Sequence, residues 1–167
     1  MGEKLTVAEK KISYSGLFNV RDLYNVFVSW ITEKDWDLIE PTHKETVSEK
    51  GKEIVFIFEP EKKMSDYVKF YGYFEIVMSD VEDIVIKKGE KDVPMNKGSV
   101  DILIKGIIKT DYEGMWVSTP LHTVMQAFYE KFIKASEIKS FKKELTADIE
   151  HLNSQLKSHL NLFQYTK

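Results

Sequence analysis

The chain has 167 residues, of which 43% are hydrophobic and 31% are charged, and its formal net charge is -3. This length can bury one hydrophobic core, so we expect a single soluble domain. The slight acidic excess disfavours general nucleic-acid binding, because phosphate backbones attract basic surfaces. Cysteine is absent, which excludes disulfides, thiol catalysis and cysteine-ligated metals. Arg21 is the only arginine, so an arginine cluster for phosphates is excluded as well.

The N-terminal segment, residues 1–11, is rich in Glu and Lys and lacks the apolar core of a signal peptide. No stretch of the chain approaches the ~20 uninterrupted apolar residues that span a bilayer. We therefore expect a cytoplasmic protein without a transmembrane segment.

A first strand is predicted at residues 12–15, and a helix follows from Asn19 to about Lys34. Asn19 can cap this helix, and Asp22 stands in its first turn, where a carboxylate complements the helix dipole. Apolar residues recur at helical spacing and predict one broad buried face, formed by Val20, Leu23, Tyr24, Phe27, Trp30 and Ile31.

Segments rich in Val, Ile, Phe and Tyr follow, separated by Gly and Pro, as is typical of strands joined by turns. They predict strands at residues 36–47, 53–59, 66–78, 81–87 and 99–112. Residues 50–52 are typical of a tight hairpin turn, and residues 87–97 of a longer loop. The result is a mostly antiparallel meander.

Two glycines stand in the middle of these strands, on the faces that alternation assigns to the core. Gly72 shares its face with Phe70 and Phe74, and Gly106 shares its face with Ile104. A glycine inside a strand usually marks a bulge, a bend or the close approach of another element. The pair therefore predicts a curved sheet that coils around a helix.

The chain changes character at Pro120, because every glycine and proline lies at or before this residue. Ser118 or Thr119 can cap a helix that begins at Pro120. Its apolar stripe is predicted to be buried in the curved sheet and consists of Leu121, Val124, Met125, Phe128, Phe132 and Ile133.

A second amphipathic stretch continues at spacings of three and four, and its apolar residues include Phe141, Leu145, Ile149, Leu152, Leu156 and Leu160. A straight helix from Pro120 would be roughly 70 Å long, more than one small domain can cover. The chain must therefore fold back near Ala135 or meet a partner. We favour an intermolecular contact, because the segment offers no Gly or Pro for a turn.

This order of elements resembles the START-like, or helix-grip, superfamily of ligand-binding domains. The resemblance covers about residues 10–134 and rests on the first strand, the helix from Asn19, the Gly72 and Gly106 bends, and the Pro120 helix. The second helix that usually follows the first strand is shortened or missing. The fold expected is α+β, with a curved antiparallel sheet around a long C-terminal helix and an additional C-terminal amphipathic helix.

The resemblance implies residues 1–134 as the helix-grip-like part and residues 135–167 as a helical extension of one compact domain. It also implies an apolar cavity between sheet and helix that holds a lipid-like or polycyclic molecule. The candidate lining residues are Phe70, Phe74, Ile104, Trp116, Met125 and Phe128. Trp116 can equally pack on the start of the Pro120 helix as a hydrophobic staple.

Signatures of other chemistry are weak. The four histidines, His43, His122, His151 and His159, lack the spacing of a metal site. The acidic group at Glu75, Asp80, Glu82 and Asp83 lacks the glycine of a calcium loop. No nucleophile turn is present, so we expect no metal or cofactor, and an enzyme is disfavoured.

The outward row of Lys69, Tyr71 and Tyr73 could stack bases, but the acidic chain favours plain packing.

Two functions remain open from the sequence. The first is a binding or carrier domain for a hydrophobic small molecule in a sheet–helix cavity. The second is an interaction or homo-oligomerisation module, in which residues 137–163 pair with another copy or with a helical protein partner. The identity of the ligand does not follow from the sequence.

Overall fold

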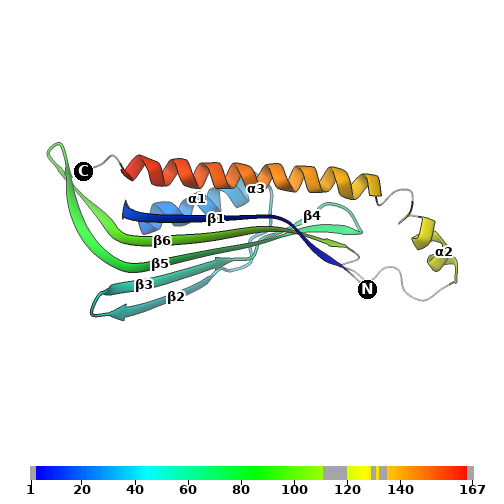
Figure 1. Cartoon of the computed structure of the whole chain (residues 1–167), viewed down its shortest axis with the longest axis horizontal. Helices are drawn as coiled ribbons and strands as arrows, with labels where there is room; N and C mark the ends of the chain where they lie inside the picture. The colour runs from blue at the N-terminus through cyan, green and yellow to red at the C-terminus, as the bar shows by residue number, and fades with distance from the viewer. Residues whose placement is uncertain (1–2, 111–119, 129–130, 132–134, 165–167) are drawn as a thin grey trace.

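A computed structural model describes residues 3–110, 120–128, 131 and 135–164 of the chain. The fold is α+β, as expected: an open antiparallel sheet is covered on one face by helices α1 and α3 (Figure 1). The helices are α1 (Val20–Glu33), α2 (Pro120–Phe128) and α3 (Ala135–Gln164). The strands are β1 (Lys4–Phe18), β2 (Thr42–Ser48), β3 (Gly51–Phe58), β4 (Glu61–Lys63), β5 (Val68–Lys88) and β6 (Lys91–Thr110). They pair in the order β1-β6-β5-β3-β2, and β4 pairs with β5.

Three strands are longer than the sequence predicted. β1 spans 15 residues rather than four, because it pairs with β6 from Lys4 to Phe18. The strands predicted at residues 66–78 and 81–87 form one strand, β5, which begins at Val68. The prediction of a long loop at residues 87–97 is wrong. Lys88 pairs with Lys91 around a two-residue turn, whose first residue, Gly89, has a φ of 64°. Glycine at this position is what a tight type II′ hairpin turn requires.

The β5–β6 hairpin bends at a bulge. The register shifts between Ser79 and Glu82, and Asp80 adopts a φ of 53°. Glycines stand on the neighbouring strands at this point: a Cβ on Gly98 would lie 2.7 Å from the Ser79 carbonyl oxygen, and one on Gly51 would lie 2.9 Å from that of Val81. The bulge therefore turns the end of the hairpin, residues 82–97, out of the sheet towards the helix layer (Figure 1). We call this end the hairpin arm.

Both ends of helix α1 are defined by local hydrogen bonds. Asn19 accepts a hydrogen bond from the Asp22 N–H at 3.0 Å, which confirms the predicted cap. At the other end Asp35 has a φ of 57°, and the N–H groups of Asp35 and Trp36 donate to the carbonyls of Thr32 and Ile31. This is a Schellman ending, completed by contact between the rings of Trp36 and Trp30.

The apolar face of α1 packs on β3 and β5. Phe27 stacks on Phe58 with ring centroids 5.3 Å apart, and Trp30 meets Phe74 edge-on at 5.6 Å. Leu23 and Ile31 are also buried. These contacts fix the helix over the sheet and leave its N-terminal end beside the hairpin arm.

The helix held by the sheet is α3, which corrects the role expected of the Pro120 helix. Its stripe of Leu145, Ile149, Leu152, Leu156 and Leu160 is at most 2% exposed, and Phe141 packs at its edge. α3 lies on β1 and β6, where Lys10 and Glu150 form an ion pair of 2.6 Å. The intermolecular role favoured for this stripe is therefore corrected too, because the same chain already covers these side chains.

Helix α2 begins at Pro120, as predicted, and is described as far as Phe128, and α3 is described from Ala135. It lies at the end of the molecule opposite the hairpin arm (Figure 1). The described part of its stripe is exposed rather than buried: Leu121, Val124, Met125 and Phe128 are 51–69% exposed, and Phe132 and Ile133 lie outside the described residues. Among the described helices, none is long and apolar enough to cross a membrane.

Candidate functional site

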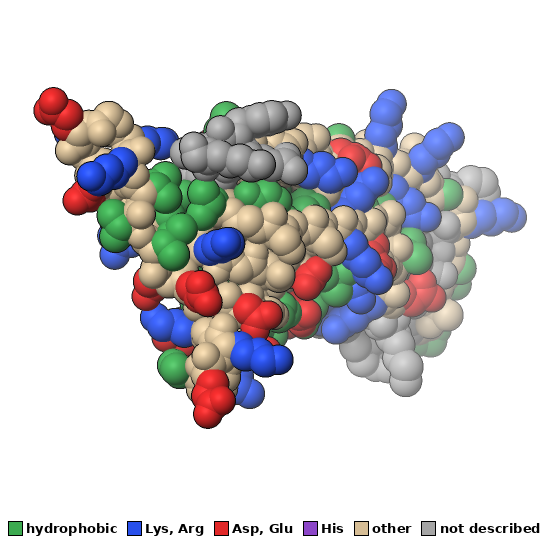
Figure 2. All heavy atoms as spheres, turned by 60° about the vertical axis from the view of Figure 1, so that its left-hand side comes forward, with side chains coloured by type: hydrophobic (Ala, Val, Ile, Leu, Met, Phe, Trp, Pro, Cys, Tyr) green, Lys and Arg blue, Asp and Glu red, His purple; other side chains and the backbone are tan. Residues whose placement is uncertain are grey.

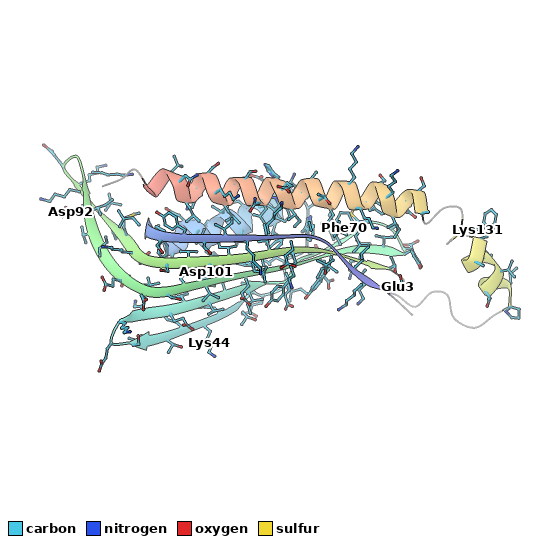
Figure 3. The ribbon with its side chains drawn as sticks, in the orientation of Figure 1. Glu3, Lys44, Phe70, Asp92, Asp101 and Lys131 are labelled. Atoms are coloured by element: carbon cyan, nitrogen blue, oxygen red, sulfur yellow. The ribbon has the colours of Figure 1, made fainter. Side chains whose placement is uncertain are left out.

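The residues expected to line a cavity are divided between two environments. Phe70, Phe74 and Ile104 are fully buried in a packed core, where Phe70 meets Phe141 edge-on at 5.8 Å. Figure 3 shows Phe70 between the sheet and α3. Met125 and Phe128 lie exposed on α2, and Trp116 lies outside the described residues. Among the described candidates, the structure therefore separates Met125 and Phe128 from the three residues in the core.

A groove of about 980 Å³ lies elsewhere, at the end of the molecule where the hairpin arm leaves the sheet. Hydrophobic side chains gather on this side, below the projecting arm (Figure 2). The N-terminal end of α1 forms one wall, the arm forms the second, and residues 40–43 with Phe56 form the third. Its apolar lining consists of Val20, Tyr24, Pro41, Phe56, Ile84, Val85, Pro94 and Met95. We call it the arm groove.

Three aromatic rings form a continuous surface in the arm groove. Phe56 is 8% exposed and lies between the other two rings. Tyr24 meets Phe56 edge-on with centroids 5.1 Å apart, and His43 stacks on Phe56 at 4.7 Å. The rings come from α1, β3 and β2, so the fold of the sheet under α1 assembles this surface.

A chain of polar contacts holds the arm against α1. The Asn96 side chain accepts a hydrogen bond from the Val20 N–H at 3.0 Å and donates to Asp83 at 2.8 Å. Asp83 also forms an ion pair with Lys52 at 3.2 Å. Because Asn96 and Asp83 stand on opposite strands of the arm, these bonds link both strands to the sheet and helix. The groove is thus largely preformed.

A second groove, of about 580 Å³, lies between α1 and α3. Most of the residues that line it are of polar type and include Ser29, Glu33, Gln155 and His159, whereas Val26 and Leu162 are apolar. Burial lowers the pKa of His159, although the nearby Asp22 carboxylate acts in the opposite direction. With few apolar residues, this groove suits an apolar ligand less well than the arm groove.

The sheet face that points away from the helices carries the row Lys69, Tyr71 and Tyr73. Lys69 pairs with Glu61 at 2.7 Å, and the two tyrosine hydroxyls donate to Glu59 and Glu75. Burial and the hydrogen bond to Glu59 raise the pKa of Tyr71. These carboxylates would repel a phosphate backbone, so the geometry gives base stacking no support.

The histidines and acidic residues assemble no metal site within the described part of the chain. His43 lines the arm groove, and His159 lines the second groove, between α1 and α3. On α3, Nε2 of His151 lies 3.4 Å from Nε2 of Gln155. The side chain of His122 lies outside the described residues.

Comparison with known proteins does not assign the chain: no protein-family model matches it, and no curated protein sequence matches it.

Sequence reasoning missed the arm groove because its residues come from five separate segments. Two local signals were present. The first is Pro94, because a proline within a strand pattern indicates an edge strand. In the structure, β6 pairs with β1 only as far as Asn96, so Pro94 lies in the part of β6 that has no β1 partner. Asp80 follows a long apolar alternation and permits the left-handed turn of the bulge. Neither signal says that α1 lies opposite.

Proposed function

We propose that this chain is a binding or carrier domain for a small molecule with an apolar body, held in the arm groove. The observation that supports this proposal is a preformed groove of about 980 Å³, which combines eight apolar residues with a few polar side chains. Small-molecule sites have this character and commonly a volume of roughly 300–1,000 Å³.

Of the START-like resemblance, one feature supports the proposal: a sheet that holds a helix. The helix in this position is α3, where residues 120–133 were expected. The ligand site moves from the core to the mouth of the sheet, because aromatic side chains fill the core. The cysteine-free sequence suits a cytoplasmic carrier.

Filling the groove tests the proposal. Val85 lines the arm groove and is 65% exposed, so Val85→Trp adds volume there without entering the core. We expect binding of 6-phenylhexanol, followed by NMR titration, to weaken by about tenfold, because the indole ring occupies the apolar space of the ligand. Native mass spectrometry of the purified wild type should detect any retained ligand.

Val47→Trp is the matched control, because Val47 is an exposed strand valine, 72% exposed, outside the groove lining. Its affinity should remain within about twofold of wild type. Equal binding by wild type and Val85→Trp would refute the groove as the site.

A second candidate is a homo-oligomerisation module that acts through α2 instead of α3. The observation that favours it is the exposed stripe of Leu121, Val124, Met125 and Phe128, since such patches commonly mark contacts. If α2 pairs with another copy, Val124→Ser with Met125→Ser should lower the mass measured by light scattering while circular dichroism stays unchanged. A wild type that is monomeric at all concentrations would eliminate this function.

A further inference from the structure

The arm groove carries charges that select among apolar ligands. Three carboxylates line it, those of Asp22, Glu40 and Asp83, against the single guanidinium of Arg21. Asp83 is engaged by Lys52 and Asn96, which reduces its effect on a ligand. Among the described residues, Asp22 and Glu40 form no ion pair with Lys or Arg. The start of α1 balances part of the charge of Asp22, so Glu40 is the carboxylate more open to a bound cation.

The positive end of α1 is partly engaged by side chains of the chain itself. The first N–H of the helix, that of Val20, donates to Asn96, and the N–H of Asp22 donates to Asn19. The N–H of Leu23 donates to the Asn19 carbonyl at 3.0 Å. The Asp22 carboxylate also stands in the first turn, where it offsets the partial positive charge of the helix. The N–H groups of Val20 and Asp22, which could otherwise bind an anion at the helix start, are therefore already engaged.

The aromatic surface favours a cation independently of the carboxylates. The faces of aromatic rings carry negative electrostatic potential and attract ammonium groups within about 6 Å of the ring centroid. Tyr24 and Phe56 both line the groove, with centroids 5.1 Å apart. His43 stacks on Phe56, which is 8% exposed, so the half-buried Tyr24 is the more accessible of these two rings. A cation placed beside them would lie in the same groove as Asp22 and Glu40.

We propose that the ligand of the arm groove is an organic cation, an amine or quaternary ammonium compound with an apolar body. This inference rests on the proposed function of the groove and adds the charge of its ligand. The apolar lining on the arm holds the body, the ring surface holds the ammonium group, and Glu40 and Asp22 neutralise it.

Three probes with the same body and different charge test the inference: 6-phenylhexylammonium, 6-phenylhexanol and 6-phenylhexanoate. We titrate each into the whole chain in low-salt buffer at about pH 8, where the two charged probes keep their charge and surface electrostatics is least screened. The cation should bind at least about fivefold more tightly than the carboxylate, with the alcohol between them.

Glu40→Gln should weaken binding of the cation and leave the affinity for the alcohol unchanged. Glu49→Gln is the control, because Glu49 is exposed and outside the groove lining. Val85→Trp should weaken all three probes alike. If the carboxylate binds as tightly as the cation and Val85→Trp blocks both, the inference is wrong and the proposed function stands. If no probe binds, or none responds to Val85→Trp, the proposed function is wrong and the inference falls with it.

Discussion

Leu152→Ala is expected to lower the free energy of unfolding by about 2–5 kcal/mol, the usual effect of emptying a fully buried leucine site. Leu152 is 0% exposed and belongs to the core cluster under α3. For a chain of this size the melting temperature should fall by roughly 4–20 °C. The triple change of Leu145, Leu152 and Leu156 to Ser should unfold the chain, because total stabilities are only about 5–15 kcal/mol.

Leu162→Ala provides the matched control, since this leucine stands on the same helix and is 73% exposed. Its melting temperature should change by a small fraction of the Leu152→Ala shift. Urea unfolding by circular dichroism measures both changes, and light scattering records the mass. Equal effects of the two substitutions would contradict the packing of α3. An oligomer that dissociates with the sheet still folded would restore the intermolecular role.

Gly106→Val is expected to be the most damaging glycine substitution on the core face. A Cβ on Gly106 would lie 2.8 Å from Ile149 Cγ1 and 3.0 Å from Leu145 Cγ, closer than carbon atoms pack. Valine adds two further carbons, so α3 must move away from β6 or Ile149 and Leu145 must leave their rotamers. We expect a loss of about 1–3 kcal/mol or more. Gly72→Val should cost less, because a Cβ on Gly72 would lie 3.0–3.2 Å from its neighbours, Phe74 and Pro60, and so would clash less closely.

A double-mutant cycle identifies the cause of the Gly106→Val effect. Ile149→Ala alone destabilises the core, but in the Gly106→Val background it also removes the clash, so its cost should be smaller there. Unfolding midpoints of the four proteins measure this coupling. Additive effects would mean that Gly106 serves the strand itself and not the close approach of α3.

The sequence by itself determined the elements whose signals are local. Asn19, Asp22 and the helical spacing from Val20 to Ile31 predicted α1 almost to its ends, because caps and periodic apolar residues act within one segment. Alternation predicted the core faces of β5 and β6 for the same reason. The glycine at position 106 correctly indicated the close approach of another element.

Only the tertiary structure decided which helix the sheet holds. The stripes after Pro120 and after Ala135 are both apolar and periodic, and periodicity does not state which surface covers each. α3 is held because its leucines meet β1 and β6 over several turns, whereas the nine-residue α2 leaves its stripe exposed. The arm groove is likewise tertiary: the bulge at Asp80 aims the hairpin arm, and contacts between residues 76 positions apart, Val20 and Asn96, hold it beside α1.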